Sequence, residues 1–577
     1  MTRKPRKLPY AVANFEQIHE EGYSFVDKTA YIRELENFQV PVFLRPRRFG
    51  KTLWCSTLEC YYDILRKERF QELFGGLDIG RDPTGLQNKF MVLRFNFSQV
   101  QVSDQLPALE QSFRTICHAA LQPFCEKYAG HLGNLVIDES KSVSDNFSRI
   151  LAQAAKPGVP PIYLIIDEYD NFSNQYVTSG RDDLYQNLTT GDSFFRTFFK
   201  VVKAGCESRA IGKVFITGVL PITMDDLTSG FNIAEIVTLA PELHGMLGFT
   251  QAEVDRYLGQ VYEDYAMDRA SFDSTRELVR SWYNGYKFLP DTEETLYNST
   301  ILTYFLKTFA LRKAYPEDMV DPNVKTDVSW IERLGFGSGT PLDLMQDLLR
   351  GDGLAYDARQ LRDKFNMSRF FQREHFAMSL FFLGMLTVKD RRYLAFPNQT
   401  LASIFADYYS QLARIEVSRG YDGYFADFRQ DLDLGRLFGG FWKVYMGQIP
   451  AQAFDKINEN FIRTTFFELC TRYLLLDFSF GIEVNHASGR ADWEMLGRPE
   501  TEYRNQKWIV EFKHFPNSSG KTPSDFTVPD PQAVAQAEGY KRDTLAQFPQ
   551  YQVRTAVCMT VGNQGFRWFD LEAGGEG

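Results

Sequence analysis

The sequence predicts an α/β protein made of three successive units, and three observations support this prediction. In residues 1–235, short apolar runs alternate with amphipathic helical segments, which is typical of a parallel sheet with helices on both faces. Residues 236–440 have a mostly helical pattern, and residues 441–577 return to an α/β alternation. A chain of 577 residues also exceeds what one hydrophobic core usually serves.

Composition narrows the class of protein. Hydrophobic residues make up 44% of the chain and charged residues 24%, as in ordinary soluble domains. The formal charge of −10 gives no overall attraction to nucleic acid, so any such binding needs a local basic face. Seven cysteines without a CxxC pair fit reduced thiols, and no apolar run approaches the ~20 residues of a membrane span. We therefore expect a cytoplasmic protein with no membrane partner.

The elements of each unit can be named from their patterns. In the first unit we expect strands at 40–44, 91–97, 162–166 and 213–217, with helices from about 51 and over 194–204. In the last unit we expect a helix at 458–475, strands at 482–484, 490–495 and 508–512, a helix at 532–542 and a strand at 553–560.

The middle unit contains two recognisable signals. GFTQAEVDRYLGQVY has a threonine cap and an acidic first turn before an apolar helix face. FFLGMLTVKDRRYLAFPN predicts two short strands joined by a polar turn at 389–392. Helices next to such a hairpin indicate a winged-helix-like unit, for which packing is a commoner role than reading DNA.

The stretch FLRPRRFGKTL, residues 43–53, has the second half of a phosphate-binding loop. In such a loop backbone N–H groups surround the phosphates, a lysine contacts the β- and γ-phosphates, and a hydroxyl binds Mg²⁺ at a helix N-terminus. Gly50, Lys51 and Thr52 provide these groups between an apolar run and a helical run. A basic surface turn is the alternative for this stretch alone.

The first half of the loop departs from the usual pattern. Arg45 stands where a glycine is usual, and Pro46 lacks an N–H donor. The positive charge of Arg45, Arg47 and Arg48 is expected to compensate by binding phosphate.

Two further strands end in polar residues that suit the same site. PIYLIIDEYDNF is an apolar strand ending in Asp167, a candidate Mg²⁺ ligand, and Glu168, which can orient or deprotonate the attacking water. KVFITGVLPIT ends in Thr217, which can lie between the aspartate and the γ-phosphate as a sensor. Strand ends are commonly polar, so it is the ordered combination that predicts an ATP site.

These motifs, together with YSFVDKTAYIREL, GFTQAEV and WYNGYKF, resemble the AAA-ATPase-like family of bacterial proteins. The P-loop of that family reads RPRRFGKT, so Arg45 in place of glycine is the rule there. The resemblance covers the first half of the chain and implies ATP and Mg²⁺ binding through Lys51, Thr52, Asp167 and Glu168. The role of residues 27–29 stays open.

A second constellation lies in the last unit, in SGRADWEML and WIVEFKHF. Residues two apart in a strand face the same way, so Glu511 and Lys513 project together, and Asp492 can converge with Glu511 if its strand is the antiparallel neighbour. Two carboxylates and waters suffice for Mg²⁺, and the lysine can orient or deprotonate the attacking water. A cross-strand ion pair on a solvated face is the structural alternative.

Three more side chains are candidates around this constellation. Glu468, on the preceding helix, is expected to be a third metal ligand, while Gln536 and Tyr540 lie four apart on one helix face. Together with D…ExK they resemble the PD-(D/E)XK nuclease superfamily, with Ala491 in the place of the proline. The resemblance implies that Asp492, Glu511 and Lys513 are the catalytic set. His486 and His514 lack metal-ligand spacing and are expected not to bind a metal.

The leading hypothesis is therefore an ATPase coupled to a Mg²⁺-dependent nuclease that hydrolyses nucleic-acid phosphodiester bonds, with DNA favoured over RNA. A nucleotide-gated regulator whose inactive nuclease fold binds DNA or protein is the alternative, and an ATP-dependent scaffold is a third. The sequence leaves open the biological role and whether the chain forms a homo-oligomer.

Overall fold

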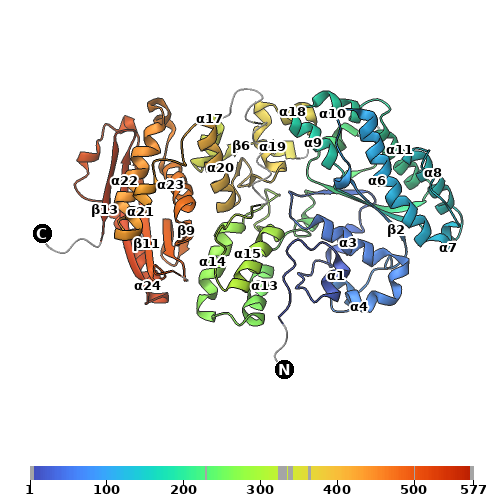
Figure 1. The fold of residues 1–577 in the computed structure, drawn as a ribbon, viewed down its shortest axis with the longest axis horizontal. Coiled ribbons are helices and arrows are strands. Elements are labelled where there is room, and N and C mark those ends of the chain that lie inside the picture. The colour runs from blue at the N-terminus through green and yellow to red at the C-terminus, as the bar shows by residue number, and fades with distance from the viewer. Residues whose placement is uncertain are drawn as a thin grey trace.

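The computed structural model describes residues 5–227, 231–322, 334, 342–361, 365–499 and 501–571. Three parts follow one another along the long axis of the molecule, with the middle helices between two sheet-containing parts (Figure 1). None of the helices in the described part of the chain has the length and apolar character that a bilayer crossing requires.

The N-terminal sheet is parallel throughout, with the strand order β2-β3-β4-β1-β5. Its strands are β1 (Pro41–Leu44), β2 (Met91–Asn96), β3 (Ile162–Asp167), β4 (Ile211–Gly218) and β5 (Glu235–Ile236). The four expected strands are present with ends shifted by two residues or fewer, whereas β5 was missed because two residues are too few to show a pattern.

The register of this sheet brings the polar strand ends to one edge. Phe43 of β1 is opposite Thr217 of β4, and Asn96 of β2 is opposite Asp167 of β3. Because the strands are parallel, the loop after β1 and the acids after β3 lie at the same carboxyl edge, with β4 between them.

Helices cover both faces of the sheet. On one face, Tyr62 of α3 (Lys51–Tyr62) stacks on Tyr163 of β3 with ring centroids 4.3 Å apart. On the other face, Phe95 of β2 contacts Phe147 of α8 (Val143–Ala154) and Phe198 of α11 (Phe194–Glu207). The predicted α/β class, with a helix-covered parallel sheet, is confirmed.

The middle part is mostly helical, as expected. Its main helices are α13 (Gln251–Asp264), α14 (Phe272–Tyr283), α15 (Ser299–Arg312), α17 (Leu342–Leu349), α19 (Phe376–Phe382) and α20 (Gln399–Leu412). The predicted cap of α13 is a full capping box between Thr250 and Glu253. The predicted hairpin is β7 (Thr387–Val388) and β8 (Tyr393–Ala395), to which β6 (Leu354–Ala355) adds a third strand.

The C-terminal sheet is mixed, with the order β13-β12-β11-β10-β9. Its strands are β9 (Phe478–His486), β10 (Gly489–Gly497), β11 (Gln506–Phe515), β12 (Gln552–Val561) and β13 (Gly565–Asp570), and only β11 and β12 pair in parallel. Helix α23 (Glu459–Leu474) packs Phe466 on Trp493, while Tyr540 of α24 (Pro531–Gln547) joins Ala491 and Ile509 on the opposite face.

One helix runs across the expected boundary at 440/441. Helix α22 (Leu434–Val444) packs on the C-terminal sheet, because Phe438 contacts Phe512 of β11 and Trp568 of β13. Strand β13, with the sequence GFRWFD, was not predicted. Arg567 interrupts its aromatic residues, Asp570 follows them, and the strand lies close to the end of the chain.

Candidate functional site

The loop after β1 turns into α3 through two left-handed residues. Gly50 has φ 90° and Arg48 has φ 70°, so these two residues, rather than Arg45, take the left-handed positions of the loop. Helix α3 begins directly at Lys51, and its first-turn N–H groups are available for a phosphate. The geometry thus retains the anion-binding half of the device.

Lys51 lies inside the loop. Lys51 is only 4% exposed, and its ammonium group donates to the carbonyls of Arg45 and Pro46, each at 3.2 Å. The same Nζ is 3.7 Å from Oε1 of Glu168. The structure therefore brings the loop lysine and the acid after β3 together, as expected.

Asp167 and Glu168 differ in their surroundings. Asp167 is fully buried, Arg94 of β2 donates to its Oδ2 at 2.8 Å, and its Oδ1 has no hydrogen-bond partner among the described residues. Burial raises the pKa of Asp167. Glu168 is partly exposed and has φ 54°, so its side chain turns toward Lys51 instead of continuing the strand.

These groups fit a hard cation beside a phosphate. A buried carboxylate oxygen without a partner is costly unless a water or ion satisfies it. Asp167 Oδ1 is such an oxygen, and Thr52 lies in the first turn of α3 on the wall of the adjoining cavity. Mg²⁺ would be held by Thr52 and Asp167, with waters completing its octahedral shell.

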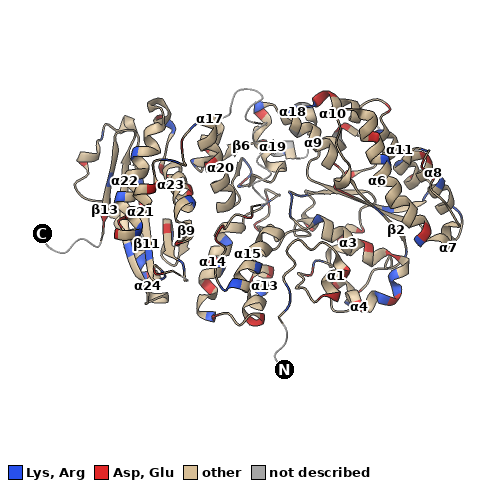
Figure 2. Ribbon diagram, in the orientation of Figure 1, with Lys and Arg blue, Asp and Glu red and all other residues tan. Residues whose placement is uncertain are grey.

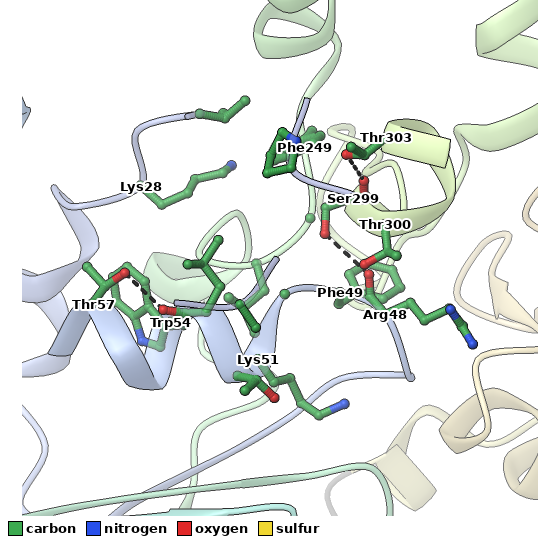
Figure 3. A pocket seen from close by; sticks show the side chains of 18 of the residues that line it. Lys28, Arg48, Phe49, Lys51, Trp54, Thr57, Phe249, Ser299, Thr300 and Thr303 are labelled. Atoms are coloured by element: carbon green, nitrogen blue, oxygen red, sulfur yellow. Dashed lines mark hydrogen bonds between the residues drawn. The ribbon is translucent and has the colours of Figure 1, made fainter. Parts of the chain in front are cut away.

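A cavity of about 260 Å³ adjoins the loop (Figure 3). Gly50, Lys51, Thr52, Arg48 and Glu168 line its polar end. Its other walls are largely apolar and come from three further segments: Pro9, Val12, Phe25 and Val26 near the N-terminus, Met246, Leu247 and Phe249 before α13, and Ser299, Thr300 and Thr303 of α15. A polar end for phosphates and an apolar remainder for a flat ring suit a nucleotide.

The cavity also explains the segment 27–29. Lys28 lines it, and its Nζ donates to the carbonyl of Gly245 at 2.8 Å and pairs with Glu253 at 2.6 Å. Asp27 accepts from the N–H and hydroxyl of Thr29 and from the N–H of Asp78. These contacts tie the N-terminal segment to the capping box of α13, so the segment builds one wall of the cavity.

Three expected nucleotide-binding side chains lie elsewhere. The guanidinium of Arg45 is 1% exposed and donates to the carbonyls of Leu44, Thr238 and His244, between the rings of Phe43 and Phe288. Arg45 therefore has a packing role in this geometry, because its donors face carbonyls inside the protein. Arg47 is exposed and is not part of the cavity wall.

Thr217 is also directed inward. It is fully buried, and its hydroxyl donates to the carbonyl of Phe43 at 2.8 Å. Thr217 lies on β4, between β1 and β3, and its hydroxyl proton is engaged by β1, so its expected role as a sensor stays a prediction.

The second constellation converges as the strand pattern predicted. β10 and β11 are antiparallel neighbours, the N–H of Asp492 donates to Oε1 of Glu511 at 3.1 Å, and the N–H of Phe512 donates to Oδ2 of Asp492 at 2.9 Å. Burial, and then the charge of Asp492, raise the pKa of Glu511 to about 8, while Lys513 lowers it. The carboxylates and the lysine thus share one electrostatic site.

An arginine that the sequence reasoning missed holds this site. Arg463 of α23 is 6% exposed, and its guanidinium donates to Oδ1 of Asp492 at 2.7 Å and to Oε1 of Glu483 at 2.9 Å. Glu483 has φ 54° in the middle of β9, which marks an irregularity at this point of the strand. Oδ1 of Asp492 is therefore already occupied by a cationic partner.

The acid that α23 contributes is Glu459, and Glu468 lies elsewhere. Burial, and then the charge of Asp492, raise the pKa of Glu459. Glu468 instead pairs with Arg472 at 2.6 Å, and Arg472 contacts Asp407 of α20. Nine residues of α-helix rotate by about two and a half turns, so the two glutamates point to opposite sides of α23.

The donor set fits a hard cation only in part. Among the described residues, no three His, Cys, Asp or Glu side chains are grouped closely enough to hold a metal by themselves. Burial, and then the charge of Asp492, raise the pKa of Glu511, and a divalent cation between the two carboxylates would relieve the second of these effects. Mg²⁺ would be held by these two carboxylates with waters, and Glu459 is near enough to interact electrostatically with both.

Of the remaining side chains near this site, Tyr540 and His514 make structural hydrogen bonds, whereas Gln536 differs. Tyr540 is 1% exposed, donates to the carbonyl of Arg490 at 3.0 Å and stacks on His486. Gln536 has a buried Oε1 without a partner in the described region. His514 bonds to Thr560, and burial lowers its pKa to about 4.

Arg94, Glu459 and Arg463 were missed, and a signal existed for each. Arg94 interrupts the apolar run MVLRFNF, and a charge in a buried strand requires a partner. Glu459 and Arg463 are four apart at the start of a helix, so they lie on one face.

Comparison with known proteins supports the two kinds of domain that the motifs predict. Residues 9–228 match the family model described as "Predicted AAA-ATPase", and residues 457–569 match that of the PD-(D/E)XK nuclease superfamily. An AAA-ATPase-like domain and a PD-(D/E)XK domain share this chain. The architecture expected from the motifs is confirmed, and the first match covers the loop with Lys51 while the second covers Asp492, Glu511 and Lys513.

Two individual proteins are also similar. An uncharacterized protein in the vnfD 5′ region of Azotobacter chroococcum mcd 1 is 28% identical over 306 residues, which are 52% of this chain and 51% of that protein. The chain thus matches about half the length of this relative. The Walker-type ATPase PABY2304 of Pyrococcus abyssi aligns over 70% of this chain and 99% of its own at 12% identity and a TM-score of 0.39, too low to establish a shared fold.

Proposed function

We propose that the protein binds and hydrolyses ATP in its N-terminal domain and, in its C-terminal domain, hydrolyses phosphodiester bonds of nucleic acid with Mg²⁺, with DNA favoured over RNA. The observation that carries the proposal is the presence of two separate sites in one chain. One joins Lys51 and Glu168 at a nucleotide-sized cavity, and the other joins Asp492, Glu511 and Lys513.

At the first site, the roles follow from position. Lys51 has to leave the carbonyls of Arg45 and Pro46 to contact the β- and γ-phosphates, and Glu168, then freed from Lys51, is placed to orient the attacking water. Mg²⁺, when bound, neutralises charge on the phosphates. Arg48 is the loop arginine that lines the cavity, so we assign it to phosphate binding and Arg45 to packing.

At the second site, the charge of Lys513 acts on Glu511 and Glu459 at the same time, which places its ammonium group to orient the attacking water; deprotonating that water would require Lys513 to be neutral first. Asp492 and Glu511 bind the cation, which stabilises charge on the scissile phosphate. The three-unit division also stands as a proposal, with the C-terminal unit including α22 because of its packing on β11 and β13.

The test uses the full chain. Single- and double-stranded DNA and RNA are incubated with ATP and Mg²⁺ varied independently, and ATP hydrolysis is followed in parallel. We expect Mg²⁺-dependent cleavage that Asp492→Ala and Lys513→Ala abolish, and ATP hydrolysis that Lys51→Ala abolishes. Cleavage that survives both nuclease-site substitutions would refute the site assignment, and hydrolysis that survives Lys51→Ala would refute the ATP site.

A second candidate function has its own support. Arg463 occupies Oδ1 of Asp492, and both basic and acidic residues occur along the elements of the three parts in Figure 2. Both features suit a nucleotide-gated regulator that binds DNA or protein without cutting. Binding of DNA without cleavage under every combination of ATP and Mg²⁺ would favour this function over the nuclease.

A further inference from the structure

The motif WYNGYKF lies in neither site but contacts elements of both. Its residues, Trp282–Phe288, form the end of α14 and the turn that follows, here termed the connecting segment. In Figure 1, α14 lies in the middle part, between the C-terminal sheet and the N-terminal domain. This short segment therefore contacts elements of both domains.

One end of the connecting segment packs on the phosphate loop. Phe49, the residue before Gly50, makes edge contacts with Tyr286 and Phe288 at centroid distances of 5.0 and 5.7 Å. The guanidinium of Arg45 lies 4.1 Å from the ring of Phe288. Since all four side chains are less than 5% exposed, a movement of the loop has to be accommodated by the connecting segment.

The other end packs on the elements that carry the nuclease site. Trp282 is 1% exposed, its indole N–H donates to the carbonyl of Phe480 in β9 at 3.1 Å, and its ring lies 5.7 Å from that of Phe467 in α23. Gln399, at the start of α20, donates to the next outward-facing carbonyl of β9, that of Ile482, at 2.8 Å. The carbonyl of Trp282 in turn accepts from Thr400 at 2.7 Å.

Trp282 thereby contacts both supports of Arg463. β9 carries Glu483 and α23 carries Arg463 itself, and Arg463 donates to Asp492, to Glu483 and to Asn460 of its own helix. A small displacement of β9 against α23 changes how this guanidinium is shared. Whether Oδ1 of Asp492 can bind a metal ion depends on how Arg463 shares its donors.

Close packing and backbone hydrogen bonds fix the middle of the connecting segment. Gly285 has φ 112°, and a Cβ there would lie 1.8 Å from the carbonyl oxygen of Pro397. The backbone of Lys287 exchanges hydrogen bonds with Thr387 and receives one from the N–H of Val388. A segment fixed at both ends and at its centre transmits displacement rather than absorbing it.

We propose that Trp282–Phe288 couples occupancy of the ATP site to the nuclease site, by shifting β9 and α23 so that Arg463 releases Asp492. The inference rests on the proposed nucleotide binding, and it assigns Trp282 as a positioning residue that acts through Arg463. The event that starts the shift is the departure of Lys51 from the carbonyls of Arg45 and Pro46, which changes the loop on which Phe288 rests.

The test is hydrogen exchange of the full chain with and without a non-hydrolysable ATP analogue and Mg²⁺, read at the backbone amides of residues 478–486. In the native protein we expect nucleotide to change exchange in β9 by at least about fivefold, the lower end of common allosteric couplings. Trp282→Phe keeps a ring but loses the donor to the carbonyl of Phe480. In this variant we expect unchanged nucleotide affinity, and we expect nucleotide to leave the hydrogen-exchange rates of β9 unchanged. Trp568→Phe is the matched control, because it loses an indole bond to Asp570 on β13 and should respond like the native protein.

Cleavage provides the second measurement. The ratio of cleavage rates with and without nucleotide should fall to about one in Trp282→Phe, with the nucleotide-free rate retained. Bound nucleotide without a response of β9 in the native protein, or the same response in Trp282→Phe, would overturn the coupling while leaving the ATP site intact. Absence of nucleotide binding to the native protein would instead overturn the proposed function, and the coupling with it.

Discussion

The guanidinium of Arg463 lies 2.7 Å from Oδ1 of Asp492 and 2.9 Å from Oε1 of Glu483, so one buried cation serves two carboxylates. A divalent cation that binds through Asp492 competes with this arginine for the same oxygen. In the proposed nuclease site, metal affinity therefore depends on how firmly Arg463 is held, in addition to the charge of the acids.

Arg463→Gln tests this competition. We expect the metal-free variant to melt at a lower temperature, because removing one partner of a buried ion pair typically costs about 3–5 kcal/mol. We expect the increase in melting temperature on adding Mg²⁺ or Mn²⁺ to be larger than in the native protein, since Oδ1 of Asp492 is then free. Thermal melts in chelator and in metal measure both. Arg490→Gln is the control, because Arg490 also pairs with Glu483 but is 58% exposed; a metal-induced increase no larger than the native one would contradict the prediction.

Glu459→Gln and Glu468→Gln compare two acids of the same helix. Glu459 acts on Asp492 and Glu511, whereas Glu468 pairs with Arg472 on the other side of α23. We expect Glu459→Gln to lower the cleavage rate by about 10- to 100-fold, as for groups that support a metal site. Glu468→Gln should lower thermal stability and leave the cleavage rate of the folded protein near the native value. A lower cleavage rate in Glu468→Gln than in Glu459→Gln would instead assign Glu468 as the acid of α23 that supports the metal site.

This pair also shows where sequence reasoning reached its limit. The strand acids could be predicted, because Asp492, Glu511 and Lys513 lie in apolar runs whose period of two fixes which side chains project together. The helix acid could not, because α23 is apolar over much of its surface and its rotation is set by packing of Phe466 on Trp493. A residue type and a helix assignment do not give that rotation.

In the phosphate loop, the positions of the polar strand ends could be predicted, but the direction of one arginine side chain could not. Polar ends of β1 and β3 were predictable, since parallel strands bring their carboxyl ends to one edge. The orientation of Arg45 was not, because sequence reasoning directed every loop arginine to the phosphates. The fold instead places the Arg45 guanidinium against the carbonyls of Thr238 and His244, which only the tertiary structure brings near.

Arg45→Met and Arg48→Ala separate packing from phosphate binding. Arg45→Met removes donors from three buried carbonyls, so we expect a loss of stability of several kcal/mol and little change in the ATP affinity of the folded fraction. Arg48 lines the cavity, so Arg48→Ala should lower ATP affinity several-fold with smaller loss of stability. Thermal melts and nucleotide titrations measure the two effects. Equal loss of ATP affinity in both variants would return Arg45 to the phosphate site.

Glu168→Gln should separate ATP hydrolysis from ATP binding. The carboxylate lies 3.7 Å from Lys51 and next to the cavity, as suits the group that orients the attacking water. We expect the hydrolysis rate to fall by about 10²- to 10⁴-fold, the usual contribution of a general base, with ATP affinity within a few-fold of native. Single-turnover hydrolysis and nucleotide titration provide the two values. A variant that hydrolyses ATP at the native rate would assign the base to another residue.

His244 predicts an acid-dependent weakening of the N-terminal domain. Its Nε2 lies 3.1 Å from the carbonyl of Glu294, and burial, reinforced by the charge of Arg45, lowers its pKa to about 4. Because an unfolded histidine has a pKa of about 6.5, the unfolded state binds more protons between these two pKa values, and stability falls as the pH falls from about 6.5 toward 4. Between pH 7.5 and 5 we expect the free energy of unfolding to lose on the order of 2 kcal/mol through this residue.

The variant His244→Gln isolates that contribution, since glutamine can replace the contact to Glu294 but does not titrate. The difference in free energy of unfolding between the native protein and the variant, measured by urea unfolding at pH 7.5, 6 and 5, should shift against the native protein as the pH falls. A difference that stays constant over this range would show that His244 can be protonated within the folded domain. Arg45 would then have to yield its bond to the His244 carbonyl or accept a neighbouring positive charge, which its buried setting between Phe43 and Phe288 makes unfavourable.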